Sequence, residues 1–205
     1  MRPSKLYDLL APVYGRVMGP LLEEANERAV ERLVGGAPSS ALEIGVGPGA
    51  ALAELARGAW QVVGVDVSSA MLREARTRVS QQGKQARLAR ADALRLPFRA
   101  AAFDAVLSTF LLDLLPEPDL RPMLAEVSRV LAPGGRVVLG VLELPNPLVA
   151  QAWMTVYRIA PDALGGCRPV DLTRLLDGQP LRLIRDERLD GWVTMRITTL
   201  VKVTA

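Results

Sequence analysis

The most constraining feature of this chain is residues 41–50, where a short apolar run ends on three glycines at alternate positions. The letters are ALEIGVGPGA, and a helix-forming run, ALAEL, follows at once. Glycine enters left-handed backbone conformations cheaply and leaves room for a ligand to approach the backbone. The stretch therefore predicts a strand, a sharp turn beside a ligand, and then a helix.

Three further apolar runs follow this turn, and each ends on a polar residue. They close on Asp66, on Asp92 and on Thr109. In an open α/β sheet, ligands bind outside the carboxyl ends of the strands, at the point where the strand order reverses. We therefore expect these polar groups to gather at one edge of a sheet, around a nucleoside-like ligand.

The rest of the chain alternates helical and extended patterns, as a parallel sheet buried on both faces requires. Helices are expected over 20–34, 50–57, 68–82 and 119–131. Strands are expected over 41–44, 61–65, 86–91, 102–108, 136–142, 181–189 and 192–203. The last two strands are joined by Asp190-Gly191, which favours a tight antiparallel hairpin. The predicted fold class is α/β, with a mostly parallel seven-stranded sheet, an antiparallel carboxyl-terminal hairpin and helices on both faces.

Composition restricts the functional classes. A length of 205 residues, half of them apolar, suits one domain spanning 1–205 with a substantial core. One cysteine, Cys167, and no histidine argue against a disulfide and against a usual zinc or iron site. No apolar run approaches the roughly 18 residues that span a bilayer, and no signal-peptide h-region stands near the amino terminus, so a cytoplasmic protein is expected. The net charge of +3 does not require a nucleic-acid partner.

Four motifs occur in a fixed order along the chain: Glu43-x-Gly45-x-Gly47-x-Gly49, Asp66, Asp92-Ala93 and Leu131-Ala-Pro-Gly-Gly135. Together they resemble the class I S-adenosylmethionine-dependent methyltransferases, over about residues 7–203. The resemblance implies S-adenosylmethionine as the cofactor and a Rossmann-like variant of the sheet. The expected carboxyl-terminal hairpin agrees with it, because a dinucleotide-binding domain would usually continue with parallel units.

The resemblance implies roles for the first two motifs. Gly45, Gly47 and Gly49 would pass beneath the methionine part of the cofactor, and Glu43 would lie near its ammonium. Asp66 stands about 20 residues beyond the turn, where a carboxylate accepts hydrogen bonds from both ribose hydroxyls. A plain strand-to-helix turn would also explain the glycines, and a helix cap would also explain Asp66.

The later motif positions are expected around the adenine and the transferred methyl group. Val67 and Met71 would flank the adenine ring, although a methionine at helical spacing also suits a core. Asp92 and the Ala93 amide would recognise the adenine edge, unless Asp92 simply forms the turn before Leu94. Thr109 would face the transferred methyl group.

Residues 7–14, YDLLAPVY, resemble the amino-terminal segment of the lipid and quinone methyltransferase branch. In that branch two tyrosines close over the cofactor. Tyr7 is thus expected at the cofactor and Tyr14 at the reacting centre, within a helical cap over 1–35. Both tyrosines could instead bury their rings and leave the hydroxyls at the surface.

Methyl transfer from a sulfonium is an in-line displacement, which mainly needs alignment and exclusion of water. An acceptor that must lose a proton often uses a histidine base, and this chain has no histidine. Asp113, flanked by leucines beyond the fourth strand, is the nearest replacement, because burial would raise its pKa. A solvated residue at the start of a helix is the alternative.

Residues 144–170 form an apolar insert with aromatic residues a turn apart, which suits a lid over a lipophilic acceptor. Phe110 would face the transferred methyl, Trp153 and Tyr157 would line the acceptor site, and Arg168 would meet an anionic head group. A buried helix followed by an ordinary turn explains the same letters. We expect a small-molecule or lipid acceptor, either a phospholipid amine or a secondary metabolite, ahead of a quinone precursor. Peripheral contact with a membrane is left open.

Two other functional classes compete with this interpretation. A nicotinamide-dependent oxidoreductase would space its glycines as Gly-x-Gly-x-x-Gly and would need a proton donor that the chain does not offer. A protein that binds S-adenosylmethionine without methylating would carry the same cofactor residues. The signatures of adenine-N6 and cytosine-C5 methylation are absent, so no nucleic-acid partner is expected. The oligomeric state does not follow from the sequence.

Overall fold

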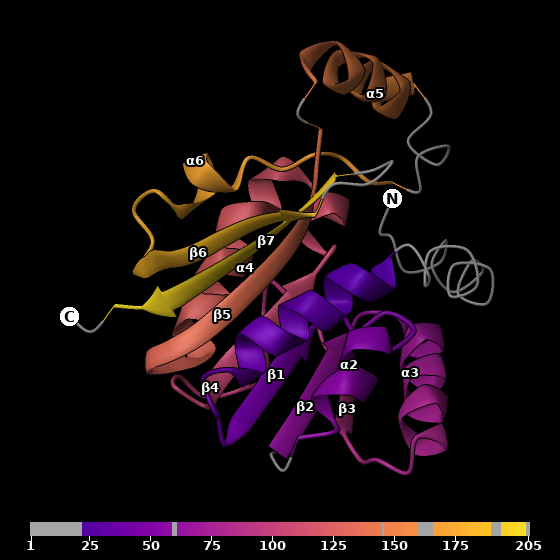
Figure 1. Ribbon diagram of the computed structural model, residues 1–205, viewed down its shortest axis with the longest axis vertical. Coiled ribbons are helices and arrows are strands. Elements are labelled where there is room, and N and C mark those ends of the chain that lie inside the picture. Colours follow the sequence, from indigo (N-terminus) through magenta and orange to yellow (C-terminus); the bar gives the residue numbers. More distant parts are fainter. Residues whose placement is uncertain (1–21, 59–60, 145, 160–165, 190–193, 204–205) are drawn as a thin grey trace.

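The computed structural model describes residues 22–58, 61–144, 146–159, 166–189 and 194–203. Within these residues one seven-stranded sheet has the order β3-β2-β1-β4-β5-β7-β6. Strands β1 to β5 are parallel, and β7 runs antiparallel to both β5 and β6. The predicted α/β fold with an antiparallel carboxyl-terminal hairpin is confirmed (Figure 1).

The elements alternate along the chain as the sequence predicted. The strands are β1 (Ser40–Ile44), β2 (Gln61–Asp66), β3 (Arg87–Arg90), β4 (Phe103–Thr109), β5 (Leu131–Glu143), β6 (Leu181–Leu189) and β7 (Thr194–Lys202). The helices are residues 22–34, α2 (Ala50–Leu55), α3 (Ser69–Gln81), the 3-10 turn η1 (Leu112–Leu114), α4 (Glu117–Val130), α5 (Pro147–Ile159) and α6 (Leu172–Leu176).

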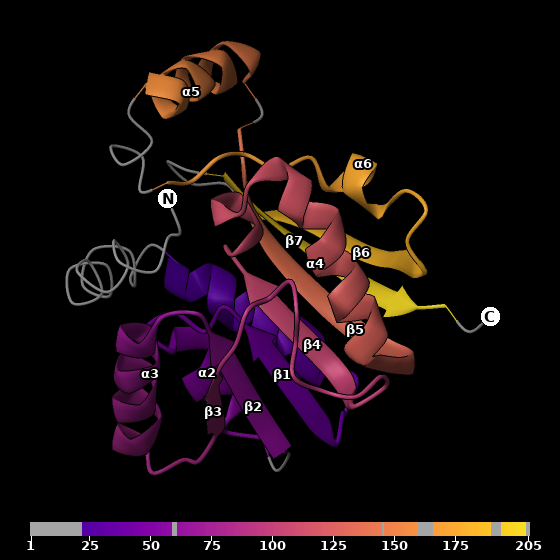
Figure 2. The same ribbon diagram turned by 180° about the vertical axis from the view of Figure 1, so that it is seen from behind.

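Helices cover both faces of the sheet. The helix of residues 22–34 packs with α2 and α3 on one face, and α4 and α6 pack on the other, which Figure 2 shows from behind. Consecutive residues of the central strands enter opposite cores: Val106 belongs to the α4 side and Leu107 to the α2 side. Side chains of a strand alternate between its faces, so the unbroken apolar runs of β4 and β5 supply two cores at once.

The turn after β2 begins α3 as expected. Ser68 is the N-cap, and its hydroxyl accepts a hydrogen bond from the Met71 N–H at 3.3 Å. Gly83 follows the helix with a φ of 68°, which suits the end of a helix. These local signals fix where α3 begins and ends.

Several boundaries differ from the prediction. β5 begins at Leu131 rather than at Arg136, because Leu131 already pairs with Phe103 across a register shift. α4 begins at Glu117, earlier than expected, because Pro116 serves as the N-cap and a second proline stands in the first turn. The hairpin turn at 190–191 lies outside the described residues, but the pairing of Leu189 with Met195 confirms the antiparallel hairpin.

Helix α5 lies apart from the two packed layers, at the top of Figures 1 and 2. None of its described residues is buried. It follows β5 directly, so it lies at the edge of the sheet where the parallel strands end. No helix in the described part of the chain is both long and apolar enough to cross a bilayer.

The single-domain organisation over 1–205 and the cap over 1–35 stay predictions. The described residues share one sheet and the two cores that flank it. Of the predicted cap, the structure describes only the helix from residue 22 onward.

Candidate functional site

A pocket opens where β1, β2 and β4 end. Its walls come from the turn after β1, the start of α3, the residues after β4 and the helix of residues 22–34. Among the predicted site residues, the pocket is lined by Glu43, Gly45, Gly47, Asp66, Val67, Met71, Thr109 and Phe110. The structure thus brings these eight positions together at one edge of the sheet, and their roles stay predictions.

The glycine turn has the conformation that its sequence demands. Gly45, Gly47 and Gly49 have φ values of 78°, 50° and 83°. The N–H groups of Gly45 and Val46 both donate to the Val65 carbonyl, at 2.8 and 3.1 Å. The turn therefore folds back onto β2 and forms one wall of the pocket.

Asp66 joins two walls of this pocket. Its Oδ2 accepts a hydrogen bond from the Gly47 N–H at 2.9 Å, and its Oδ1 accepts one from the Ser68 N–H at 2.8 Å. The cap of α3 is Ser68, so Asp66 is not needed for that task. Asp66 lines the pocket, and its contact with the ribose stays a prediction.

Glu43 is a buried carboxyl group inside this pocket. Its side chain is 2% exposed, and Oε2 has no hydrogen-bond partner among the described residues. Burial, and secondarily the charge of Asp66, raise the pKa of Glu43 well above its ordinary value. Oε2 of Glu43 is therefore a buried polar atom at the pocket that the described chain does not pair.

Asn26 is a pocket residue that the sequence analysis missed. It belongs to the helix of residues 22–34, is 8% exposed, and its Oδ1 also lacks a partner within the described chain. The sequence did offer a signal for it, because Asn26 lies on the same apolar face of that helix as Leu22 and Leu33. A polar amide among buried apolar side chains normally has a hydrogen-bond partner, so its presence there marks a candidate functional residue.

Phe110 stands at the end of β4 in an unusual backbone conformation. Its φ is 59°, while its N–H donates to the Gly140 carbonyl at 2.8 Å. A bulky residue in the left-handed region stores strain, and such strain concentrates at functional sites. Phe110 and the neighbouring Thr109 both line the pocket, although their contacts with a methyl group or acceptor stay predictions.

Asp92 and Ala93 do not line the pocket. Asp92 is exposed, and its Oδ1 accepts a hydrogen bond from the Leu94 N–H at 2.9 Å. This contact is the turn that the sequence offered as an alternative. Recognition of the adenine edge by these two residues stays a prediction, and the pocket lining gives it no support.

Asp113 and Arg168 come together, but away from the pocket lining. Asp113 is 1% exposed, and both its oxygens accept from the Leu142 N–H at 3.1 Å. Buried Arg168 donates from Nε and Nη2 to the Leu115 carbonyl, at 3.1 and 2.8 Å. The alternative of a solvated Asp113 is wrong. Its role as a base and the head-group role of Arg168 stay predictions. The contact of Asp113 joins η1 to β5, and Arg168 joins its own segment to the residue after η1.

Burial raises the pKa of Asp113 from 3.8 to about 7, against the lowering effects of the Leu142 N–H and of Arg168. The stability contributed by the neutral carboxyl is fully present below its unfolded pKa and is lost as pH rises through about 7. Asparagine at this position would not titrate, so we expect the stability of Asp113→Asn relative to the wild type to increase as the pH rises from about 4 to about 7. Above about pH 7 the difference should stay constant. Urea unfolding of both proteins across this range measures the difference. A difference that is constant with pH would contradict the assignment.

The predicted lid contains helix α5. The indole N–H of Trp153 donates to the Cys167 carbonyl at 2.9 Å, and Tyr157 lies on the same partly buried face of the helix. Neither residue lines the pocket. Their acceptor contacts stay predictions, and Tyr7 and Tyr14 lie outside the described residues.

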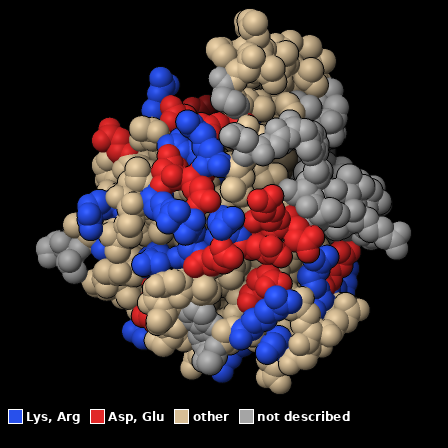
Figure 3. All heavy atoms as spheres, viewed as in Figure 1, with Lys and Arg blue, Asp and Glu red and all other residues tan. Residues whose placement is uncertain are grey.

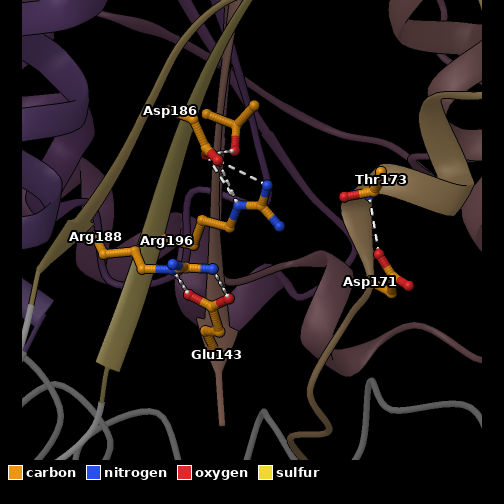
Figure 4. Close-up of polar contacts among 7 residues, drawn as sticks. Glu143, Asp171, Thr173, Asp186, Arg188 and Arg196 are labelled. Atoms are coloured by element: carbon orange, nitrogen blue, oxygen red, sulfur yellow. Dashed lines mark hydrogen bonds and ion pairs between the residues drawn. The ribbon is translucent and has the colours of Figure 1, made fainter. Parts of the chain in front are cut away.

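A second polar cluster ties the carboxyl-terminal hairpin together and lies outside the pocket lining. Asp186 accepts hydrogen bonds from Arg196 and from Thr198, and Arg188 pairs with Glu143 of β5 (Figure 4). Across the face that carries β6 and the helix of residues 22–34, basic and acidic side chains lie next to one another (Figure 3). Arg196 lowers the pKa of Asp186, so this cluster is a set of matched charges that supports the hairpin.

Comparisons with known proteins agree with the geometry. A family model described as a methyltransferase domain matches residues 41–135. A demethylmenaquinone methyltransferase of Thermus thermophilus is 42% identical over 137 residues, which are 65% of this chain and 60% of the relative. One of Lactiplantibacillus plantarum is 33% identical over 163 residues, 74% of this chain and 68% of the relative. The chain belongs to the class I S-adenosylmethionine-dependent methyltransferases.

Other similar proteins are more varied. A phosphatidylethanolamine N-methyltransferase of Cereibacter sphaeroides is 33% identical over 129 residues, 62% of each chain. An N-methyltransferase structure from Bradyrhizobium japonicum, solved with S-adenosyl-L-homocysteine, has a TM-score of 0.70 at 20% identity and covers 87% of this chain and 86% of its own. The [4+2]-cyclase SpnF has a TM-score of 0.78 at 19% identity, with coverage of 98% and 95%. These structures show the shared fold. The methyltransferase chain spans 60% to 68% of the length of the three curated relatives.

Family membership makes S-adenosylmethionine the cofactor, and the pocket fits it. The cofactor carries an ammonium, which suits the buried oxygens of Glu43 and Asn26. Its ribose hydroxyls suit the carboxylate of Asp66, and the close approach of its amino-acid part suits Gly47, where no atom lies within 4 Å of the position of a Cβ. When bound, S-adenosylmethionine would supply the electrophilic methyl group, and the predicted role of these lining residues is to bind and orient it.

Proposed function

We propose that this methyltransferase transfers the methyl group of S-adenosylmethionine to a small lipophilic acceptor by in-line displacement. The acceptor classes are a phospholipid amine or a secondary metabolite, and the names of the curated relatives add a quinone precursor to those that must be tested. The observation that carries this proposal is the apolar helix α5, which follows β5 at the edge of the sheet where the pocket opens.

The outer face of α5 supports a lipophilic partner. Leu148 and Ile159 are 76% and 81% exposed, and Val149 and Val156 lie between them on the same side. Trp153, Met154 and Tyr157, on another side of the helix, are partly buried. Exposed apolar stripes of this kind mark sites of interaction.

The charges of α5 favour a membrane surface as the place where the acceptor is met. The helix has no acidic residue, and Arg158 stands beside Ile159 at its end. Helices that lie in a bilayer interface combine an apolar stripe with basic residues on the polar side. We therefore propose peripheral contact through α5, which also delivers a lipophilic acceptor to the edge of the sheet.

An acceptor panel tests the proposed function. The protein is incubated with S-adenosylmethionine and, in separate reactions, phosphatidylethanolamine vesicles, a demethylated quinone in vesicles, and water-soluble amines. We expect formation of S-adenosylhomocysteine with at least one lipophilic acceptor and none with the soluble amines. Turnover of soluble amines alone would contradict a lipophilic acceptor.

A non-methylating role is the second candidate, because a cyclase shares this fold over nearly the whole chain. Binding of S-adenosylhomocysteine without its formation from any acceptor would favour that role. Formation of S-adenosylhomocysteine with any member of the panel would exclude it as the main function.

The double variant Leu148→Asp, Ile159→Asp is expected to reduce binding to anionic vesicles at least tenfold, because two exposed apolar side chains that would insert into the lipid become negatively charged. Flotation with phosphatidylglycerol vesicles measures the binding. The matched control is Leu183→Asp, Ile184→Asp on β6, where both side chains are about half exposed. If both double variants bind vesicles equally, α5 is not the contact surface.

A further inference from the structure

Arg168 is a buried cation that lies outside the pocket lining. Its exposed fraction is 9%. Nε and Nη2 of its guanidinium both donate to one oxygen, the Leu115 carbonyl, at 3.1 and 2.8 Å. Burying a charged group is unfavourable unless the group is hydrogen-bonded. An arginine that is buried in order to hold one backbone carbonyl indicates that the position of this stretch of backbone has a function.

Arg168 holds the backbone of residues 113–115 at two points. Its own N–H donates to the Asp113 carbonyl at 2.9 Å, and its guanidinium donates to the Leu115 carbonyl. Gly166 of the same segment lies against the residue between these two points, because a Cβ added there would lie 3.8 Å from Cδ2 of Leu114. Residues 166–168 therefore lie along η1 and fix its backbone from outside.

The stretch that Arg168 holds is also a wall of the pocket. Leu111, Leu114 and Leu115 line the pocket. The N–H groups of Leu114 and Leu115 donate to the carbonyls three residues earlier, at 3.0 and 3.3 Å. A single 3-10 turn has few hydrogen bonds of its own, and their geometry is poor. The contacts from outside, those of Arg168 among them, therefore determine where the side chains of this wall lie.

The order of the strands places this wall on the side of the pocket toward α5. In the order β2-β1-β4-β5, Asp66 ends β2, whereas η1 follows β4 and α5 follows β5. The segment that carries Arg168 is tied to α5, because the Trp153 indole N–H donates to the Cys167 carbonyl at 2.9 Å. In both views this segment crosses the top of the sheet toward α6 (Figures 1 and 2). The leucine wall therefore lies on the α5 side of the pocket, away from Asp66.

We propose that Arg168 is a positioning residue for methyl transfer, which fixes the backbone of residues 113–115 so that Leu114 and Leu115 form the wall that aligns the acceptor. The inference rests on the proposed function, in that the acceptor enters from the α5 side. It differs from a head-group contact, because Nε and Nη2 of the guanidinium are directed to the protein's own backbone. An in-line displacement depends on alignment, so a small shift of this wall slows the transfer strongly.

Hydrogen exchange tests the positioning role without any acceptor. Arg168→Met removes the guanidinium and keeps a long apolar side chain. We expect the amides of Leu114 and Leu115 to exchange roughly tenfold faster in this variant, because a buried charge-assisted contact that holds the turn is lost. Arg121→Met is the matched control, since Arg121 also donates to two backbone carbonyls, at 2.9 and 3.0 Å, near the end of α6 and outside the pocket lining. The control should leave these two amides unchanged.

Kinetics separate the alignment of the acceptor from the binding of the cofactor. Phosphatidylethanolamine vesicles and a demethylated quinone in vesicles are the two acceptors. We expect Arg168→Met to lower kcat roughly 10- to 100-fold and to change the affinity for S-adenosylhomocysteine by less than about threefold. Arg168→Lys keeps the charge and a donor, so it should recover part of kcat. A head-group contact would instead raise KM for phosphatidylethanolamine alone and leave the hydrogen exchange unchanged.

The two measurements keep this inference apart from the proposed function. Unchanged exchange of Leu114 and Leu115 in Arg168→Met would overturn the inference, whether or not an acceptor reacts. Faster exchange with an unchanged kcat would overturn it as well, and so would a loss of S-adenosylhomocysteine affinity as large as the loss of kcat. If no acceptor reacts with the wild type, the proposed function fails, while the exchange still shows whether Arg168 holds the wall. If Arg168→Met does not fold, Arg168→Lys is compared with Arg121→Lys in the same way.

Discussion

Replacing Asp66 with alanine is expected to weaken binding of S-adenosylhomocysteine roughly 5- to 150-fold, the equivalent of about 1 to 3 kcal/mol for a lost charge-assisted contact. The loss has two sources. The ribose loses its predicted acceptor, and the glycine turn loses the hydrogen bond from the Gly47 N–H that holds it beside α3. Removing the Ser68 contact loosens the start of α3 as well.

Calorimetric titration of the variant measures this effect, and Asp186→Ala is its matched control. Asp186 is also a hydrogen-bonded aspartate, but it pairs with Arg196 and Thr198 on the carboxyl-terminal hairpin, outside the pocket lining. Asp186→Ala should lower stability slightly and leave cofactor affinity unchanged. Unaltered affinity in Asp66→Ala would refute the ribose assignment.

The parts of the site that the sequence predicted are those formed by local chain geometry. The strand, the glycine turn and Asp66 follow from short-range patterns, because parallel strands bring their carboxyl ends to one edge. The cap at Ser68 is local as well. These features need no knowledge of how distant segments pack.

The parts that the sequence missed or left open depend on packing between distant segments. Asn26 enters the pocket only because its helix crosses the carboxyl end of β1. The contacts of Asp113 are with the N–H of Leu142 and with Arg168, both remote along the chain. The early start of β5 depends on a register shift against β4. Apart from the place of Asn26 on the apolar face of its helix, residue patterns carry no signal for such contacts.

Gly49 is the position where the largest loss of stability is expected. Its φ is 83°, and a Cβ added there would lie 2.6 Å from Cα and 2.7 Å from Cβ of Ala75, in the middle of α3. Gly49→Ala thus combines left-handed strain of about 1 to 2 kcal/mol with overpacking of about 1 to 3 kcal/mol. The sum is a large share of the roughly 5 to 15 kcal/mol that stabilise a typical domain.

Gly83→Ala separates the two contributions. Gly83 has a φ of 68°, but no atom lies within 4 Å of the position of its added Cβ. We expect the free energy of unfolding of this control to fall by about 1 to 2 kcal/mol, from backbone strain alone. That of Gly49→Ala should fall clearly more, as urea unfolding would measure. Equal losses would mean that α3 moves away from the turn without cost. A larger loss at Gly49 would show that close packing of α3 against the turn contributes to stability, because the backbone penalty is common to both variants.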